Sequence, residues 1–182
     1  KRAGLSLDQI EAEYVRAFEA GEDVARLHSG DLSVYSAVAE QMRRLDRRGI
    51  PYTLTPGVPA FAAAAAALKR EFTVPEVAQS LVITRVSGRA SAMPEREQLA
   101  AFAATGATLA IHLAIHSLPE IVRDLTPLYG AACPVVVVFK ASWPEQRILK
   151  GTLATIETEV AKDPIDRTAL IFVGPGLGAE DF

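Results

Sequence analysis

The sequence contains little cysteine, little tryptophan and no long apolar segment. Cys133 is its only cysteine, which excludes a disulfide framework and a cysteine-rich zinc site and is typical of a reducing compartment. No stretch reaches the roughly 18 consecutive apolar residues that a transmembrane helix requires. The 22 acidic residues outnumber the 19 basic ones, so the chain lacks the basic excess of a typical nucleic-acid-binding protein. We therefore expect a cytoplasmic protein with neither a nucleic-acid nor a membrane partner.

The chain also lacks an opening methionine and a basic-plus-apolar leader. Its only methionines are Met42 and Met93, and the final residues follow a strand pattern without a finishing element. We interpret the sequence as an internal stretch of a longer protein, long enough for one large domain or two small ones.

Hydrophobic periodicity and turn residues predict alternating helices and strands. Ser6–Gln9 and Ser117–Glu120 each have the pattern of a capping box at a helix start. The β-branched run within Pro134–Phe139 is typical of a strand that is buried on both faces. The predicted helices cover residues 7–20, 34–47, 59–70, 94–105, 118–129 and 155–162, and the predicted strands cover residues 24–28, 51–55, 81–86, 108–113, 134–139, 147–152 and 168–173.

This alternation indicates an α/β fold with two small domains. The weakly patterned stretch Thr73–Gln79 separates them, so we predict an N-terminal domain over residues 1–76 and a C-terminal domain over residues 77–182. Ligands of α/β proteins bind at the carboxyl ends of strands. The loops that follow strands, and are therefore candidates for a site, are residues 29–31, 56–61, 87–93, 113–117, 140–147 and 174–178.

Two of these loops have the features of a shared small-molecule site. In Ser29-Gly30-Asp31, the glycine lets a ligand approach the backbone, and the aspartate can accept a hydrogen bond from the ligand. Taken alone, the same turn is more typical of an ordinary N-terminal helix cap. The stretch from Pro56-Gly57 to Phe61 holds the same position after the next predicted strand. Two such turns side by side favour a ligand site.

The other motifs favour structural roles. His112 and His116 have the spacing of helical metal ligands, but His112 falls in a predicted strand, so we expect structural or substrate-lining roles and no metal. Cys133 precedes a buried strand and is expected to be an inert thiol. The stretch Gly174–Gly178 lacks the ending of a phosphate-binding loop and is interpreted as a plain turn. The arginines within Arg43–Arg48 suit a helix C-terminus and are expected to be solvated rather than to bind phosphate or RNA.

Two stretches of the chain match motifs of a known enzyme family. They are His28-Ser29-Gly30-Asp31-Leu32-Ser33-Val34-Tyr35-Ser36 and Thr55-Pro56-Gly57-Val58-Pro59-Ala60-Phe61. Both resemble motifs of the tetrapyrrole methylases, and the resemblance runs from Ser6 to the end of the chain. Thr84–Pro94 and Ala141–Arg147 resemble the branch of this family that methylates precorrin-4 at C11. The family's opening strand and glycine-proline loop are missing here, so we expect an incomplete first sheet.

The resemblance implies two small α/β domains with S-adenosylmethionine in a cleft between them, and a homodimer. Many of the implied cofactor contacts use backbone groups, which agrees with the small residues at these positions. Leu113 matches a position that packs near the adenosyl group. The implied cofactor-binding residues are Ser29, Gly30, Asp31, Val34, Pro59, Ala60, Phe61, Leu113, Ala141, Thr168 and Ala169.

The implied reaction is methyl transfer to a ring carbon of a precorrin in cobalamin biosynthesis. The protein would mainly hold the reactants in line, so we assign no catalytic nucleophile or base. The substrate carries several carboxylates, and we predict that Arg85 and Arg89 bind them, with Lys140 and Arg147 as further candidates and surface solvation as the alternative. Two other functions stay open, namely another precorrin methyltransferase and a non-catalytic module that binds S-adenosylmethionine or a tetrapyrrole.

Overall fold

A computed structural model describes residues 4–87 and 92–179 of the chain. It divides into unit 1, Lys1–Pro59, and unit 2, Ala60–Phe182. The elements are α1 (Leu7–Glu19), α2 (Val38–Arg48), α3 (Ala60–Leu68), β1 (Leu81–Arg85), η1 (Glu95–Glu97), α4 (Leu99–Ala103), β2 (Thr108–His112), η2 (Ile115–Ser117), α5 (Leu118–Tyr129), β3 (Pro134–Phe139), β4 (Arg147–Thr152), α6 (Ile156–Lys162), β5 (Ala169–Val173) and η3 (Pro175–Leu177).

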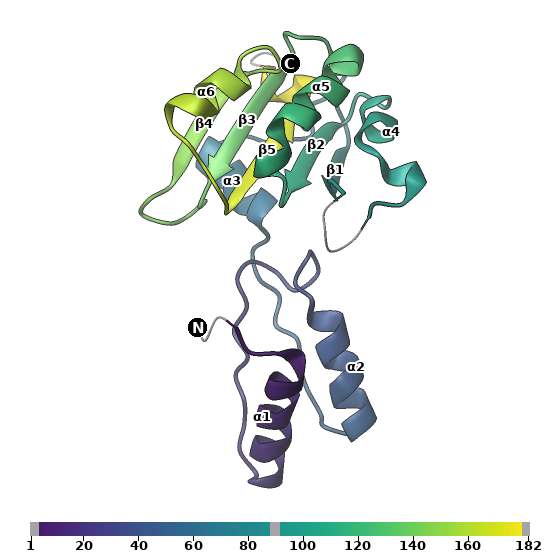
Figure 1. Cartoon of the computed structure of the whole chain (residues 1–182), viewed down its shortest axis with the longest axis vertical. Coiled ribbons are helices and arrows are strands. Elements are labelled where there is room, and N and C mark those ends of the chain that lie inside the picture. Colours follow the sequence, from purple (N-terminus) through teal and green to yellow (C-terminus); the bar gives the residue numbers. More distant parts are fainter. Residues whose placement is uncertain (1–3, 88–91, 180–182) are drawn as a thin grey trace. The chain divides into compact units, whose positions relative to one another are not determined.

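Unit 2 is built on a five-stranded mixed sheet with the order β1-β2-β5-β3-β4 (Figure 1). β1 and β2 are parallel, whereas β5 is antiparallel to both β2 and β3, and β4 is antiparallel to β3. Strands β1, β2 and β3 therefore run in one direction, and β4 and β5 run in the other. The strands predicted for this part of the chain are all present, each within one residue of its predicted ends.

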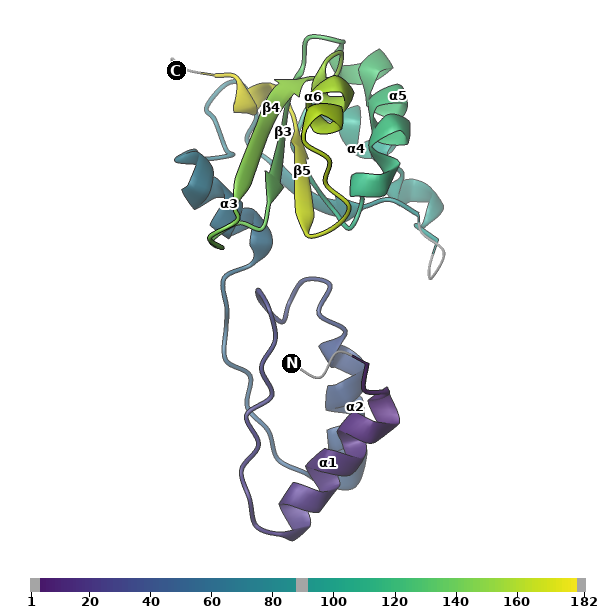
Figure 2. The same ribbon diagram turned by 60° about the vertical axis from the view of Figure 1, so that its left-hand side comes forward.

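Successive side chains of the central strands point to opposite faces of the sheet and pack in two apolar cores. Val135 and Val137 of β3 pack with α4, α5 and α6, whereas Val136 and Val138 pack on the opposite face with α3 (Figures 1 and 2). All four valines are at most 6 % exposed. The prediction that this strand is buried on both faces is therefore confirmed.

Helix α3 belongs to unit 2 in the structure. Its Ala64 is fully buried in the core that also contains Phe172 of β5. Phe172 stacks on Phe72, which lies beyond the end of α3, with ring centroids 4.5 Å apart. The compact unit thus begins at Ala60. The domain boundary between residues 76 and 77 stays a prediction.

Unit 1 contains α1, α2 and two extended segments. Strands were predicted at residues 24–28 and 51–55, and this is wrong for the described part of the chain, because no strand there pairs with either segment. The segments and the two helices line a cavity of about 1110 Å³. Val24 and Leu54 are about half exposed. A strand is held by its ladder of hydrogen bonds, so residues with β-propensity do not form one without a partner.

Two helix starts illustrate what capping patterns predict. The capping box at α1 is confirmed, because Gln9 N–H donates to Ser6 Oγ at 3.2 Å and Ser6 N–H donates to Gln9 Oε1 at 2.8 Å. The box predicted at Ser117 is wrong, because η2 runs directly into α5 and leaves Ser117 without the extended cap conformation.

The predicted helix over residues 94–105 is divided into η1 and α4 by Gln98, whose backbone is extended. No helix among the described residues has the length and apolar character needed to cross a bilayer.

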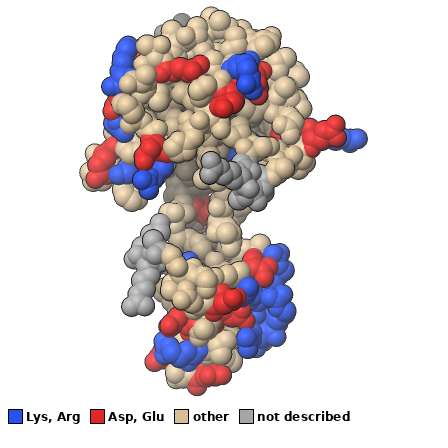
Figure 3. Space-filling view, viewed as in Figure 1, with Lys and Arg blue, Asp and Glu red and all other residues tan. Residues whose placement is uncertain are grey.

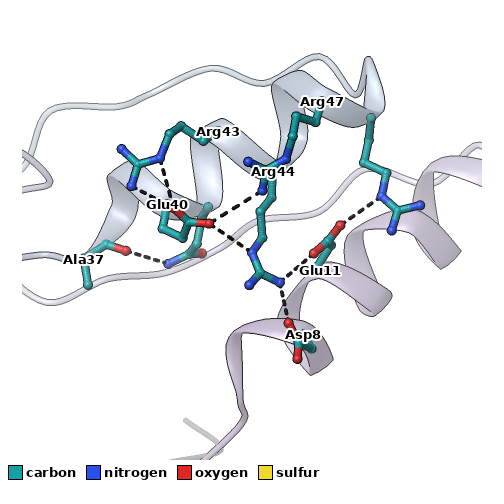
Figure 4. Close-up of polar contacts among 9 residues, drawn as sticks. Asp8, Glu11, Ala37, Glu40, Arg43, Arg44 and Arg47 are labelled. Carbon is teal, nitrogen blue, oxygen red and sulfur yellow. Dashed lines mark hydrogen bonds and ion pairs between the residues drawn. The ribbon is translucent and has the colours of Figure 1, made fainter.

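Arg44 joins α1 to α2. Its guanidinium lies 2.5 Å from the Asp8 carboxylate and 2.7 Å from that of Glu11, both on α1, and 3.4 Å from Glu40 on α2 (Figure 4). The basic side chains of α2 gather over one side of unit 1 (Figure 3). Arg44 is only 21 % exposed, so the expectation that this arginine is solvated is wrong. The acidic groups of α1 draw it into the interface between the helices.

We expect Arg44→Leu to loosen α1 from α2, because it removes the ion pairs of Arg44 with Asp8 and Glu11 and leaves only that of Arg48 with Glu11 between the two helices, among the described residues. Hydrogen-exchange mass spectrometry at neutral pH should show faster exchange in α1. Arg43→Leu is the matched control, since Arg43 is 62 % exposed and, within the described part of the chain, pairs only with Glu40 of its own helix. Equal exchange in the two variants would contradict the assignment.

The effect of Arg44→Leu on α1 should also depend on pH. Hydrogen bonds from Arg48 and then from Arg44 lower the pKa of Glu11 below its ordinary value. A carboxylate with a lowered pKa contributes stability above its unfolded pKa and loses it as the pH falls through the folded value. The difference in α1 protection between Arg44→Leu and the unmodified protein, measured by hydrogen exchange, should therefore become smaller as the pH falls.

Candidate functional site

In unit 2, the carboxyl ends of β1, β2 and β3 lie at the same end of the sheet as the amino ends of β4 and β5. Because β1, β2 and β3 end where β4 and β5 begin, Arg85 pairs with His112, and Phe139 pairs with both Arg147 and Ala169. The residues at this end, with the first residues of the adjoining loops, are called the site edge. The site edge comprises residues 85–86, 112–113, 139–141, 147 and 168–169.

Left-handed backbone is concentrated at the site edge. Leu113, Lys140 and Thr168 have φ angles of 56°, 45° and 58°, and Ser142 in the adjoining loop has 71°. Each costs roughly 1–2 kcal/mol in a residue with a side chain, and such strain clusters at ligand sites. The Lys140 N–H donates to the Thr168 carbonyl at 3.0 Å and ties the two loops together. The edge is therefore a shaped surface in which backbone groups are held in place.

The predicted cofactor-binding residues of unit 2 gather at this edge. Leu113 is apolar yet 78 % exposed, so its side chain is available to an apolar ligand group. α3 begins at the same end of the sheet (Figures 1 and 2), and its first residues are Ala60 and Phe61. Phe61 packs partly against the sheet. The predicted residues on the edge itself are Leu113, Ala141, Thr168 and Ala169.

The two predicted ligand turns of unit 1 lie side by side, as expected. Asp31 Oδ2 accepts a hydrogen bond from the Gly57 N–H at 2.7 Å. Asp31 Oδ1 accepts from the N–H of Ser33 at 2.8 Å and from the Ser33 hydroxyl. A Cβ on Gly57 would lie only 2.0 Å from the Gly30 carbonyl oxygen, so the contact requires glycine at position 57. Gly30 itself has a φ of 75°, where glycine is favoured.

The Asp31 carboxylate is engaged by the protein. Hydrogen bonds from the Ser33 hydroxyl and then from the Gly57 N–H lower the pKa of Asp31 to about 2. Asp31 therefore stays ionised at physiological pH and positions the Pro56-Gly57 turn. The sequence pattern predicts that Asp31 serves a ligand, and it does not predict this link between the two turns. The signal that could have found it is the Pro-Gly pair, which marks a tight turn beside the aspartate.

The remaining predicted residues of unit 1 flank these turns. α2 begins at Val38 rather than Val34, because Tyr35 and Ala37 have φ angles of 50° and 55° that interrupt a helix. Val34 lies in the turn that follows Asp31, and Ser29 is exposed beside Gly30. Pro59 is the last residue of unit 1. The predicted residues Ser29, Gly30, Asp31 and Val34 thus lie in one short stretch before α2.

The predicted cationic residues differ in their surroundings. Arg85 is half-buried, and its guanidinium donates to the Val86 carbonyl at 3.2 Å and to the Ala92 carbonyl at 3.3 Å. Arg89 lies outside the described residues. The Arg147 guanidinium forms an ion pair with Asp163 and lies 4.4 Å from the Phe139 ring centroid, which gives it a structural role.

The other candidate residues lie apart from the edge or have structural surroundings. The turn Gly174–Gly178 lies at the opposite end of the sheet, because β5 runs antiparallel to β2 and β3, so its place among the candidate loops is corrected. Burial raises the pKa of Cys133 to about 11, as expected for an inert thiol. His112 ends β2 and His116 lies in η2, so the two do not share a helix. Over residues 4–87 and 92–179, no group of three His, Cys, Asp or Glu could hold a metal ion.

Comparison with known proteins connects this geometry to a family. The model of the tetrapyrrole (corrin/porphyrin) methylases matches residues 1–157. A precorrin-4 C(11)-methyltransferase from a Sinorhizobium species is 70 % identical over 180 residues, which cover 99 % of this chain and 71 % of that protein.

Solved structures agree with this match. The cobalamin biosynthetic enzyme cobalt precorrin-4 methyltransferase superposes with a TM-score of 0.93 at 32 % identity, over 98 % of this chain and 75 % of that one. Uroporphyrin-III C-methyltransferase from Thermus thermophilus, complexed with S-adenyl homocysteine, gives a TM-score of 0.73 at 23 % identity, over 92 % and 72 % of the chains. At this lower identity the likeness supports the fold alone.

Proposed function

Because the chain belongs to the tetrapyrrole (corrin/porphyrin) methylase family, we propose that it transfers a methyl group from S-adenosylmethionine to C11 of precorrin-4. The family match supports the reaction. The 70 % identity to a precorrin-4 C(11)-methyltransferase supports the substrate and the position, and it is the observation that carries the proposal. The protein is thus a C-methyltransferase of cobalamin biosynthesis.

The residues present fit such a cofactor. When bound, S-adenosylmethionine supplies an activated methyl group that a ring carbon takes up, while the sulfur–methyl electron pair stays on sulfur. The two glycine-containing turns of unit 1 offer backbone N–H and C=O groups, and Asp31 adds a negative charge that suits a sulfonium. Exposed Leu113 offers apolar surface to the adenosyl group. These residues bind and orient, and rate enhancement of this kind comes from alignment of the reactants.

The family resemblance also supports finer proposals. We propose that the protein acts as a homodimer in the cytoplasm, where a lone buried thiol such as Cys133 stays reduced. Its partners are the cofactor and the tetrapyrrole. The acidic net charge of −3 offers no electrostatic attraction to nucleic acid.

The test is a methyl-transfer assay with the purified protein, precorrin-4 and S-[methyl-13C]-adenosylmethionine. We expect one labelled methyl carbon per macrocycle, assigned to C11 by NMR. Label at a different carbon would make the protein another precorrin methyltransferase. Cofactor and macrocycle binding without label transfer would make it a non-catalytic binding module, and either result would overturn the proposal.

A further inference from the structure

Trp143 is an exposed aromatic residue beside the site edge. It is the only tryptophan of the chain and is 56 % exposed. It lies in the β3–β4 loop, residues 140–146, which leaves the edge at Phe139 and returns to it at Arg147. Tryptophan is highly buried on average in folded proteins, because its ring is a large apolar surface. Folding therefore leaves this surface uncovered within unit 2.

Hydrogen bonds order the backbone of the β3–β4 loop around Trp143. The Trp143 N–H donates to the Lys140 carbonyl at 3.0 Å, and the Gln146 N–H donates to the Trp143 carbonyl at 3.0 Å. The Gln146 side chain accepts from the Ser142 N–H at 2.8 Å. Lys140 and Ser142 both have left-handed backbone. Hydrogen bonds on each side of Trp143 thus order a strained loop, so the backbone that carries the ring is preorganised.

A positive charge accompanies the ring. The Lys140 ammonium lies over the Trp143 ring, 5.3 Å from its centroid, and 5.2 Å from the Phe139 ring centroid. The Lys140 ammonium also forms a long ion pair with Glu145, whose Oε2 is 3.9 Å away, and the Lys140 side chain is 28 % exposed. Aromatic surface next to an ammonium is complementary to a conjugated ring that bears carboxylates.

We propose that Trp143 is a substrate-contacting residue whose ring stacks on a pyrrole ring of the macrocycle, with Lys140 facing one of the macrocycle's carboxylates. This inference rests on the proposed function and extends it to the recognition of the substrate. The cofactor is the less suitable occupant, because its sulfonium gains nothing from a neighbouring ammonium.

The first test is a pair of substitutions. Trp143→Ala is expected to raise the KM for precorrin-4 by about tenfold or more, as loss of a stacked ring does. Trp143→Phe retains a ring and should stay within about threefold of the unmodified protein. Leu128→Ala, at an exposed apolar position on α5 where the side chain is 46 % exposed, is the matched control and should leave KM unchanged. The Kd for S-adenosylhomocysteine, measured by calorimetry, should be the same in all four proteins.

The second test needs no turnover. Precorrin-4 added without cofactor should make the Trp143 fluorescence lifetime less sensitive to quenching by acrylamide, whereas S-adenosylhomocysteine alone should not. The Trp143→Phe protein, which has no tryptophan, gives the background signal. An unchanged KM in Trp143→Ala, or a raised Kd for S-adenosylhomocysteine instead, would overturn the inference. Shielding by precorrin-4 in a protein that fails to methylate it would support the inference and overturn the proposed function.

Discussion

A Gly57→Ala variant is expected to bind S-adenosylmethionine about tenfold to a hundredfold more weakly than the unmodified protein. The new Cβ would lie 2.0 Å from the Gly30 carbonyl oxygen and 3.3 Å from the Asp31 Cα, so the two turns would have to separate. Their separation would break the 2.7 Å hydrogen bond from the Gly57 N–H to Asp31. Overpacking of this kind costs about 1–3 kcal/mol, which is about one to two powers of ten in affinity. Isothermal titration calorimetry measures the effect directly.

The control for this variant is Gly49→Ala. Gly49 has a left-handed φ of 65° at the end of α2, but a Cβ there would meet nothing within 4 Å. It should therefore lower thermal stability through backbone strain alone and leave the cofactor affinity intact. If a folded Gly57→Ala protein binds the cofactor as tightly as Gly49→Ala does, the paired turns do not belong to the cofactor site.

The sheet of unit 2 was predictable because its strands carry their own signal. Four consecutive valines in β3 specify burial on both faces, and Gly106 and Gly130 mark the ends of the preceding helices. The direction of each strand, in contrast, has no local signal in the sequence. The antiparallel course of β5 is set by pairing with β2 and β3, and it moves the Gly174–Gly178 turn to the end of the sheet opposite the site edge.

Unit 1 shows what local patterns leave open. Residues 24–28 and 51–55 have the composition of strands, but pairing is a long-range event, and both remain extended without it. The start of α2 was missed because Tyr35 and Ala37, which are not typical of left-handed positions, adopt positive φ angles. Ser117 was expected to cap a helix, but the preceding η2 turn already continues into α5.

The candidate site was predictable as two loops but not as a set of contacts. The placement of Ser29-Gly30-Asp31 and Pro56-Gly57 after predicted strands identified the turns, and the structure brings them together. The bond that joins Asp31 to Gly57 spans 26 residues and has no periodic signal in the sequence. The same holds for Lys140 and Thr168, whose backbone contact forms only when β3 and β5 pair.

Arg85→Ala is expected to raise the KM for the precorrin by about tenfold to a hundredfold while leaving cofactor affinity nearly unchanged. Arg85 ends β1 at the site edge, where its guanidinium also donates to the carbonyls of Val86 and Ala92. A polycarboxylate substrate needs cationic partners, whereas a sulfonium cofactor gains nothing from a nearby arginine. Loss of a charge-assisted contact costs about 1.5–3 kcal/mol, which corresponds to that change in KM. Arg89→Ala is expected to behave in the same way.

Steady-state kinetics with each ligand varied separately decide whether Arg85 acts on the substrate. Arg123→Ala is the matched control, because Arg123 is 72 % exposed on α5 and pairs only with its neighbour Asp124 among the ion pairs of the described residues. Arg85→Lys keeps the charge but loses the planar fork of donors, so its KM should fall between those of the alanine variant and the unmodified protein. If Arg85→Ala instead weakens cofactor binding and keeps the KM for the precorrin, the loop after β1 serves the cofactor half of the site.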